Sequence, residues 1–164
     1  MNLIIERLSK ILESYQSHKT IVIWGAGLLG KQIQNCITLN FPQHTIIGFV
    51  DQSVSSADET TQRYPIDALS VLQPDIVIIA SVAYEKEIKA QYNAQFTDKH
   101  SVIVSFSADE EEFTRMAPSY TADELAEAVF NYPESYVLWE ELARRASDPI
   151  HKETYTNCAK ALQQ

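Results

Sequence analysis

The stretch that decides the fold is IVIWGAGLLGK, residues 21–31, where an apolar run stops at a glycine and an amphipathic run begins. This order predicts a buried strand, a tight turn and a helix. Three of the four glycines of the chain lie here, spaced as Gly25-x-Gly27-x-x-Gly30. Gly25 allows the sharp turn, Gly27 allows backbone to approach a pyrophosphate, and Gly30 allows the helix to pack closely on the sheet. Because the N-terminus of a helix attracts anions, the pattern predicts a nucleotide site.

A second apolar strand, predicted over residues 45–50, ends at Asp51. In dinucleotide-binding folds, an acidic residue at this strand end hydrogen-bonds the adenosine ribose, usually about 20 residues after the first glycine. Asp51 follows Gly25 by 26 positions, and no Lys or Arg comes after it until Arg63. The sequence therefore favours NAD over NADP, since a 2′-phosphate has no evident partner. The alternative is that Asp51 only begins a loop.

The remaining pattern up to residue 117 predicts an α/β fold, with a Rossmann-like parallel sheet and flanking helices. Strands are predicted over 20–24, 45–50, 75–80 and 101–106, with a short edge strand over 64–66. Helices are predicted over 2–16, from the glycine turn to Phe41-Pro42, over 68–72, and where Tyr84, Ile88 and Tyr92 share one face. Ser81 and Val82, just beyond the third long strand, are expected to border the ligand crevice.

Residues 118–164 predict a separate helical extension. The sequences S-A-D-E at 107–110 and T-A-D-E at 121–124 each read as a capping box that begins a helix. Further helices are predicted over 134–145 and from Asp148-Pro149, the last with Ile150, Thr154, Cys158 and Leu162 as its packed face. Helices this short need tertiary packing, so this extension is a candidate site for a protein partner or for homo-oligomer formation.

Composition limits the class of protein. The chain has 164 residues, 45% of them hydrophobic, which suffices for a folded core, and its formal net charge of −9 disfavours nucleic acid as a partner. The N-terminus does not have the pattern of a signal peptide, and no apolar run reaches the roughly 20 residues of a membrane span. Cys36 and Cys158 are far apart in the sequence and predict no disulfide. These features predict a cytoplasmic protein.

Several catalytic and metal motifs do not occur in the sequence. Residues 25–31 also fit the P-loop pattern Gly-x-x-x-x-Gly-Lys, but Gln32 stands where that loop has Ser or Thr for magnesium. The four histidines are scattered, which predicts surface residues and no metal site. No Gly-x-Ser-x-Gly elbow and no Tyr-x-x-x-Lys pair is present. Catalytic residues are therefore not identified, and enzymatic activity stays open.

The order of motifs resembles a known kind of domain. IVIWGAGLLGK, then IIGFVD, then PDIVIIAS are similar to the small Rossmann domains of bacterial surface-polysaccharide proteins, including nucleoside-diphosphate-sugar dehydratases and epimerases, sugar acetyltransferases and sugar methyltransferases. CoA-binding domains are more distant relatives. The resemblance covers residues 20–106. It implies ligand contacts at seven residues: Gly25, Ala26, Gly27, Leu28, Gly30, Asp51 and Ser81.

Two departures from that resemblance are visible. The chain departs from this pattern after Asp51, where such domains commonly carry a second acidic residue and a glycine before the next strand. A catalytic domain would be expected after the sheet, where this chain has only the helical extension.

Three hypotheses follow from the sequence. The first is a domain that binds an NAD-type dinucleotide or a nucleotide sugar, in sugar-nucleotide or surface-polysaccharide metabolism. The second is a minimal nucleotide-sugar oxidoreductase or epimerase that a partner subunit completes. The third is a non-catalytic interaction domain with a CoA-like ligand or with none.

Overall fold

The computed structural model describes residues 3–97 and 100–164. The chain divides into two compact units, Met1–Phe106 and Ser107–Gln164. The division lies upstream of the boundary predicted after residue 117, because the helix that follows Ser107 packs with the C-terminal helices. Each unit is described by itself.

The first unit is built on a parallel sheet of five strands in the order β3-β2-β1-β4-β5. The strands are β1 (Thr20–Trp24), β2 (Thr45–Val50), β3 (Arg63–Tyr64), β4 (Ile76–Ile79) and β5 (Val102–Val104). This is the predicted α/β, Rossmann-like class. The predicted bounds of β1 and β2 are confirmed, whereas β4 and β5 are shorter than predicted. The edge strand β3 ends before Pro65, which has no backbone N–H for a ladder hydrogen bond, so the predicted strand over 64–66 was misplaced.

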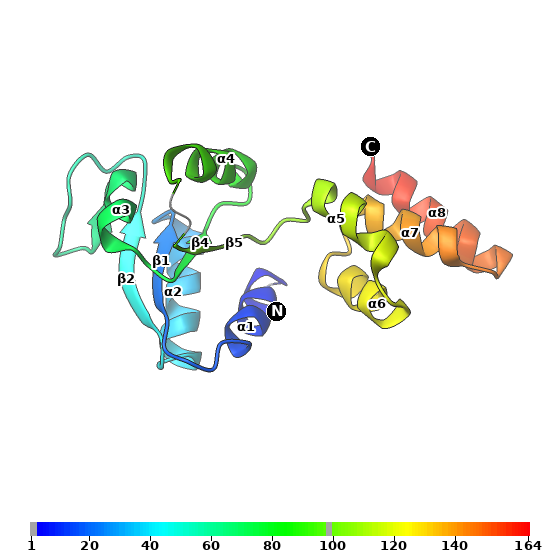
Figure 1. Ribbon diagram of the computed structural model, residues 1–164, viewed down its shortest axis with the longest axis horizontal. Helices are drawn as coiled ribbons and strands as arrows, with labels where there is room; N and C mark the ends of the chain where they lie inside the picture. The colour runs from blue at the N-terminus through cyan, green and yellow to red at the C-terminus, as the bar shows by residue number, and fades with distance from the viewer. Residues whose placement is uncertain (1–2, 98–99) are drawn as a thin grey trace. The chain divides into compact units, whose positions relative to one another are not determined.

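Helices cover both faces of this sheet (Figure 1). α1 (Leu3–Glu13) and α2 (Leu28–Asn40) pack on one face. The 3₁₀ helix η1 (Ile66–Ala68), α3 (Leu69–Leu72) and α4 (Glu85–Gln95) contribute buried side chains to the other face. α2 ends at Asn40 with Phe41 as its C-cap, as predicted, while the predicted start of α1 at Asn2 lies outside the described residues.

Burial on both faces explains why the strands are continuously apolar. In β1, Ile21 and Ile23 belong to the core beneath α1 and α2, whereas Val22 and Trp24 belong to the core beneath α3 and α4. All four side chains are 3% exposed or less. Burying each large apolar side chain contributes about 1.5–3 kcal/mol, so a polar residue anywhere in β1 would be costly.

Gly48 lets the edge strand come close to β2. The pairing of β1 with β2 shifts register between Ile21 and Val22, so Gly48 lies opposite Val22. Gly48 has φ +157°, and a Cβ there would lie 2.3 Å from the carbonyl oxygen of Gln62. The fourth glycine of the chain is thus a packing residue of the sheet, and any side chain would push β3 away.

Two buried charged residues, Arg7 and Glu85, bind the backbone of Phe106 at the end of the first unit. Arg7 of α1 donates to the carbonyl oxygen of Phe106, and the N–H of Phe106 donates to Glu85 of α4 at 2.9 Å. Arg7 is 6% exposed and Glu85 is 4% exposed. Both polar groups of the Phe106 backbone therefore have charged partners, which is how buried backbone is normally satisfied.

The structure differs from two predictions about which side chains are buried. Tyr84 is the N-cap of α4 and 66% exposed, so it is not buried as Ile88 and Tyr92 are. His44 is 6% exposed, stacks on Phe41 and accepts from the N–H of Lys19 at 3.2 Å. A single histidine in a turn carries no sequence signal of burial, because its neighbours in space come from other segments.

The second unit contains α5 (Glu110–Met116), η2 (Ala117–Ser119), α6 (Ala122–Asn131), α7 (Tyr136–Arg145) and α8 (Pro149–Leu162). Its core joins Phe113, Ala117, Leu125, Val129 and Leu138. Tyr132, at the end of α6, packs edge-on against Phe113 with ring centroids 5.2 Å apart. This unit has a hydrophobic core of its own, separate from the two cores of the sheet.

Side-chain caps begin these helices. The capping box of Thr121 and Glu124 is confirmed, and Asp148 caps α8 as predicted. The box predicted at Ser107 is wrong, since Asp109 is the N-cap and accepts from the N–H of Glu112. α7 begins after Ser135, later than predicted, because the Ser135 hydroxyl accepts from the N–H of Leu138.

The predicted packed face of α8 is wrong at three of its four residues, since only Cys158 is partly buried. Ile150 is 73% exposed and Leu162 is 41% exposed, and Thr154 is also exposed. The helix instead packs through Ala159, which is buried, and Tyr155, whose ring lies 5.9 Å from that of Trp139 on α7. A small residue on the contact face lets two helices approach closely, and hydrophobic spacing alone does not reveal this.

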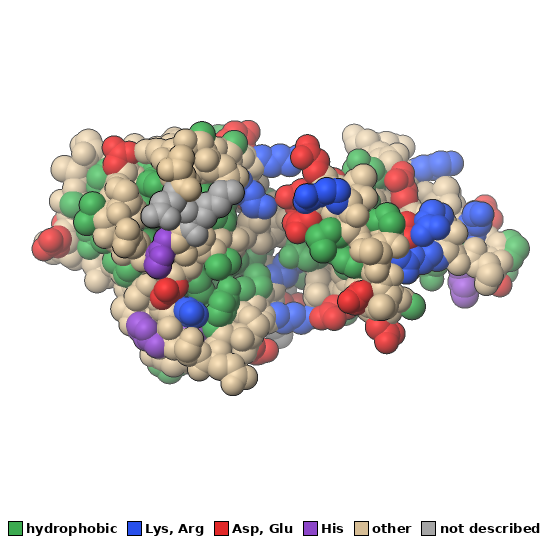
Figure 2. Space-filling model, in the orientation of Figure 1, with side chains coloured by type: hydrophobic (Ala, Val, Ile, Leu, Met, Phe, Trp, Pro, Cys, Tyr) green, Lys and Arg blue, Asp and Glu red, His purple; other side chains and the backbone are tan. Residues whose placement is uncertain are grey.

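The helical unit carries most of the net negative charge of the chain. Seven of the nine net negative charges fall within Ser107–Gln164. Figure 2 shows acidic and basic side chains over the surface of this unit. The excess of negative charge opposes association with other polyanions at low salt.

Glu141 binds two arginines of α7, and one of them, Arg145, also reaches the backbone of η2. Its carboxylate accepts from Arg144 and, at 2.7 Å, from Nε of Arg145, whose guanidinium also donates to the carbonyl oxygens of Ala117 and Tyr120. The hydrogen bond from Arg144 is the main cause that lowers the pKa of Glu141 from 4.5 to about 2, against the opposing effect of burial. The two ion pairs are local in sequence, and the lowered pKa of Glu141 makes them dependent on pH.

We expect Glu141→Gln to flatten the acid sensitivity of the helical unit. A folded-state pKa below the unfolded value means that ionised Glu141 stabilises the fold above pH 4.5 and loses this contribution as the pH falls toward 2. Wild-type Tm should therefore fall over this window more steeply than that of Glu141→Gln, as measured by circular dichroism. Glu140→Gln, which changes an exposed neighbour, serves as the control. Equal slopes for wild type and Glu141→Gln would contradict the assignment.

No helix within residues 3–97 and 100–164 is long and apolar enough to cross a membrane.

Candidate functional site

The glycine turn forms at the carboxyl end of the central strand β1. Only Gly25, Ala26 and Gly27 separate β1 from α2, which is shorter than a loop that wraps a phosphate in P-loop proteins. Gly25 has φ +114°, a conformation that side chains disfavour, and its N–H donates to the carbonyl oxygen of Val50 at 2.9 Å. The sharp turn predicted at Gly25 is present.

Gly30 brings α2 onto this turn. A Cβ at Gly30 would lie 2.1 Å from the carbonyl oxygen of Gly25 and 3.3 Å from Cε1 of Phe49. Gly30 is buried, so no group larger than hydrogen fits between the first turn of the helix and the loop. Its part in the motif is to bring helix and strand together.

Gly27, unlike Gly30, is exposed and has open space around it. It is the N-cap of α2, it is exposed, and no side chain caps the helix there. A Cβ at Gly27 would find nothing within 4 Å. Leu28, the first residue of the helix, is 76% exposed. The helix N-terminus therefore faces open space, which leaves room for an anion.

Asp51 folds back toward the glycine turn. One carboxylate oxygen, Oδ2, accepts from the N–H of Ala26 at 3.3 Å, and the other, Oδ1, accepts from the N–H and the hydroxyl of Ser53, both at 2.9 Å. The hydrogen bond from the Ser53 N–H is the largest cause that lowers the pKa of Asp51, and the other two bonds add to it against burial. Asp51 is therefore charged at neutral pH and fixed in position beside the turn.

A pocket of about 340 Å³ opens at this edge of the sheet. Its floor is formed by the ends of β1 and β4, at Trp24, Gly25 and Ala80. One wall is the loop of Asp51 and Gln52. The opposite wall is formed by Ser81 and by α4 with its N-cap, through Tyr84, Glu87, Ile88 and Gln91. The volume is at the lower end of ordinary ligand sites, which suits a nucleoside better than a whole dinucleotide.

Of the seven residues predicted to contact a ligand, three line this pocket: Gly25, Asp51 and Ser81. Ala26 adjoins it through its hydrogen bond to Asp51. Gly27 and Leu28 lie at the exposed start of α2, and Gly30 is buried behind the turn. Val82 is 54% exposed and does not line the pocket. The structure thus brings Asp51 after β2 and Ser81 after β4 together with the glycine turn after β1. The N-terminus of α2 lies next to them.

The wall that α4 provides was missed by the sequence analysis. Tyr84, Glu87, Ile88 and Gln91 follow the spacing i, i+3, i+4, i+7, which places them along one side of a helix. The apolar pattern of α4 drew attention to Tyr84, Ile88 and Tyr92, but not to Glu87 or Gln91. Polar residues at helical spacing after the third long strand were the available signal.

The charged side chains that line the pocket are acidic. Asp51 and Glu87 line it, and no Lys or Arg does so among the residues that the structure describes. A phosphate would be repelled here, whereas a sugar or base, which is neutral and rich in hydrogen-bonding groups, would be accepted. The pocket can therefore hold the nucleoside end of a nucleotide, with phosphates directed to the open N-terminus of α2.

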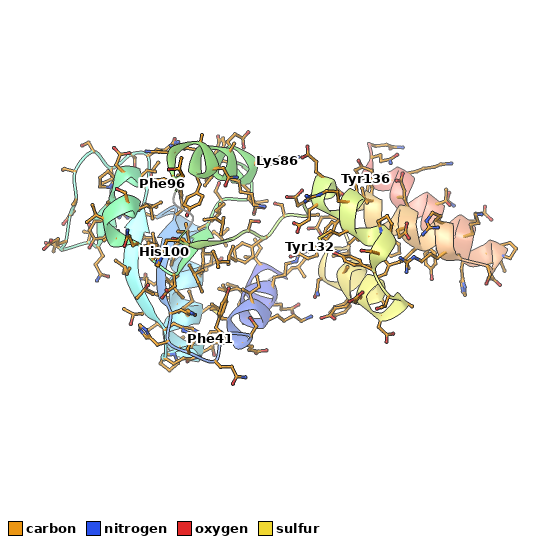
Figure 3. All side chains as sticks on the ribbon, in the orientation of Figure 1. Phe41, Lys86, Phe96, His100, Tyr132 and Tyr136 are labelled. Carbon is orange, nitrogen blue, oxygen red and sulfur yellow. The ribbon has the colours of Figure 1, made fainter. Side chains whose placement is uncertain are left out.

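Two other cavities contain none of the predicted site residues. One of about 280 Å³ lies between α3 and α4 and is lined by Phe96 and His100 among others (Figure 3). One of about 410 Å³ lies in the helical unit beside Tyr136 and Arg144. Among residues 3–97 and 100–164, no group of three His, Cys, Asp or Glu side chains is arranged to hold a metal ion.

Comparison with known proteins gives one match. The family model described as C2185-like, N-terminal matches residues 17–103, a range that contains the glycine turn, Asp51 and the pocket-lining part of α4. No curated protein and no solved structure matches the chain.

Proposed function

The chain belongs to the C2185-like, N-terminal family, and we propose that its sheet unit binds an NAD-type dinucleotide or a nucleotide sugar at the glycine turn. One observation carries the proposal. Gly25, Asp51 and Ser81, which lie far apart in the sequence, line one pocket at the carboxyl edge of a parallel sheet, next to an uncapped helix N-terminus. Ligands of open α/β sheets bind at this edge.

The chemistry of Asp51 narrows the ligand class. A fixed carboxylate accepts hydrogen bonds from ribose hydroxyl groups, and it repels a phosphate placed on the same ribose. NADP carries such a phosphate at the 2′ position, and CoA carries one at the 3′ position. We therefore favour NAD or a nucleotide sugar over NADP and CoA, although CoA was one ligand that the sequence left open.

The cellular role we propose is in sugar-nucleotide or surface-polysaccharide metabolism, where domains with similar motifs occur. The two cysteines are free, and Cys36 is buried, which suits a reducing compartment such as the cytoplasm. We propose binding without turnover by this chain alone. Residues from a protein partner or a second copy, docked on the helical unit, would have to complete a catalytic site.

Native mass spectrometry of the purified protein tests the proposal directly. A copurified NAD or UDP-sugar would support it and would name the ligand class. Copurified CoA would contradict the role given to Asp51. Protein that carries no nucleotide and binds none in calorimetric titrations would overturn the proposal.

We expect Gly27→Val to abolish most nucleotide binding and to leave the fold intact. The valine side chain meets no protein atom within 4 Å at its Cβ, but it occupies the space where phosphate would approach the backbone. Circular dichroism should match wild type, and calorimetry should show an affinity at least about tenfold lower, because a branched side chain displaces the anion from its donors. Unchanged affinity in a folded variant would remove the glycine turn from the site.

A further inference from the structure

The outer face of α8 carries an exposed apolar stripe. α8 lies beside α7 (Figure 1) and packs on it through Tyr155 and Ala159. On the opposite side of the helix, Ile150 is 73% exposed, and Thr154 and Ala161 are exposed as well. Because an α-helix has 3.6 residues per turn, these three positions lie within about 40° of one another around the helix axis. They form one stripe along its length.

Two opposite charges flank this stripe on the same side. Glu153 and Lys160 are seven residues apart, which is nearly two full turns, and both are exposed. They are about 10 Å apart along the axis, too far to pair with each other. Neither side chain forms an ion pair with any residue in the ranges 3–97 and 100–164. The outer face of α8 is therefore acidic toward its start and basic toward its end.

We infer that α8 docks on α8 of a second copy of this chain, antiparallel to it and related by a twofold axis near the middle of the helix. Such an axis places the same flank of both helices together, with the start of one beside the end of the other. Glu153 of each copy then meets Lys160 of the other, which gives two ion pairs. Ile150 of each copy lies against Ala161 and Leu162 of the other, so both exposed isoleucines are covered.

The order of the charges argues for this partner and this direction. A parallel pair would bring Glu153 against Glu153 and Lys160 against Lys160, and like charges across helices disfavour an arrangement. α8 has 14 residues and is about 21 Å long, so the interface is small and the dimer should dissociate at micromolar concentration. The inference goes beyond the proposed function, because this dimer needs no nucleotide.

Sedimentation velocity of the full chain over a range of concentrations tests the inference. At about 0.15 M salt the screening length is about 8 Å, which weakens the repulsion between two chains of net charge −9. We expect a reversible dimer. Glu153→Lys should weaken it at least about tenfold, because two attractive pairs become repulsive. The double variant Glu153→Lys/Lys160→Glu restores both pairs in reverse order and should return to within about threefold of wild type.

Glu127→Lys is the matched control, since it makes the same charge change at an exposed position on α6 and should keep the wild-type dimer. Circular dichroism establishes that each variant is folded. A wild type that stays monomeric at all concentrations, a Glu153→Lys protein that dimerises as wild type does, or a folded double variant that stays monomeric would overturn the inference.

Calorimetric titration of wild type with NAD and UDP-glucose separates this inference from the proposed function. Dimers that respond to the charge variants but bind neither ligand would support the α8 interface and count against the proposed function. Nucleotide binding by a wild type that stays monomeric would support the proposed function and overturn the interface.

Discussion

Gly30→Ala is expected to lower the free energy of unfolding by about 3 kcal/mol or more, and Tm by more than about 10 °C. Alanine favours a helix over glycine by about 1 kcal/mol, so propensity alone predicts the opposite sign. Sterics decide the result, because the new Cβ would lie 2.1 Å from the carbonyl oxygen of Gly25. That atom is backbone within the tight turn and cannot move aside as a flexible side chain would. Urea denaturation and thermal unfolding measure the effect.

Gly27→Ala is the matched control from the same motif. Its Cβ meets no atom within 4 Å, and its backbone, at φ −75°, is open to any residue. The cost should stay below about 1 kcal/mol, the usual range for losing glycine at an N-cap. Equal stability of Gly30→Ala and Gly27→Ala would mean that α2 can shift away from the turn, and that the spacing of the motif is not required for packing.

Asp51→Ala is expected to weaken NAD binding and to narrow the difference between NAD and NADP. In wild type we expect NAD to be favoured by about 1–3 kcal/mol, because ionised Asp51 accepts ribose hydrogen bonds and repels a 2′-phosphate. The lowered pKa of Asp51 keeps this charge in place at neutral pH. Calorimetric titration of both cofactors against wild type and variant gives the two differences.

Glu59→Ala controls for the loss of one negative charge. Glu59 is exposed, lies in the same connection between β2 and β3, and does not line the pocket. It should leave the NAD to NADP ratio unchanged. If wild type binds both cofactors equally, or if Asp51→Ala binds NAD as wild type does, then Asp51 only stabilises its loop through Ser53 and the N–H of Ala26.

The sheet could be predicted from the sequence because both faces of each inner strand are buried. A run such as residues 21–24 must then be apolar throughout, and the run marks the strand almost to the residue. The glycine spacing likewise has a steric cause. Gly25 has a positive φ, and a Cβ at Gly30 would clash with the carbonyl oxygen of Gly25. These features depend on local backbone geometry, so a single sequence carries them.

The α4 wall, the buried charges and the packing of α8 depend instead on contacts between distant segments. Glu87 and Gln91 look like ordinary solvent-facing residues until the loop of Gln52 is placed opposite them. Arg7 reads as a surface residue of an amphipathic helix, yet it is buried against the Phe106 backbone. In α8, Ala159 packs where larger apolar residues were expected. Helical spacing identifies a face, but only the partner segment decides which face is covered.

The parallel strand order also sets the sequence in which this molecule can assemble. The central strand β1 pairs with β4, which lies far along the chain, so that Thr20 and Asp75 meet across 55 positions. Loop closure over such distances slows folding, whereas the C-terminal helices pack with neighbours close in sequence. During synthesis on the ribosome, the glycine turn emerges well before α4 does. We therefore expect the nascent chain to acquire its ligand pocket only after α4 has left the exit tunnel, and the helical unit to fold more rapidly than the sheet.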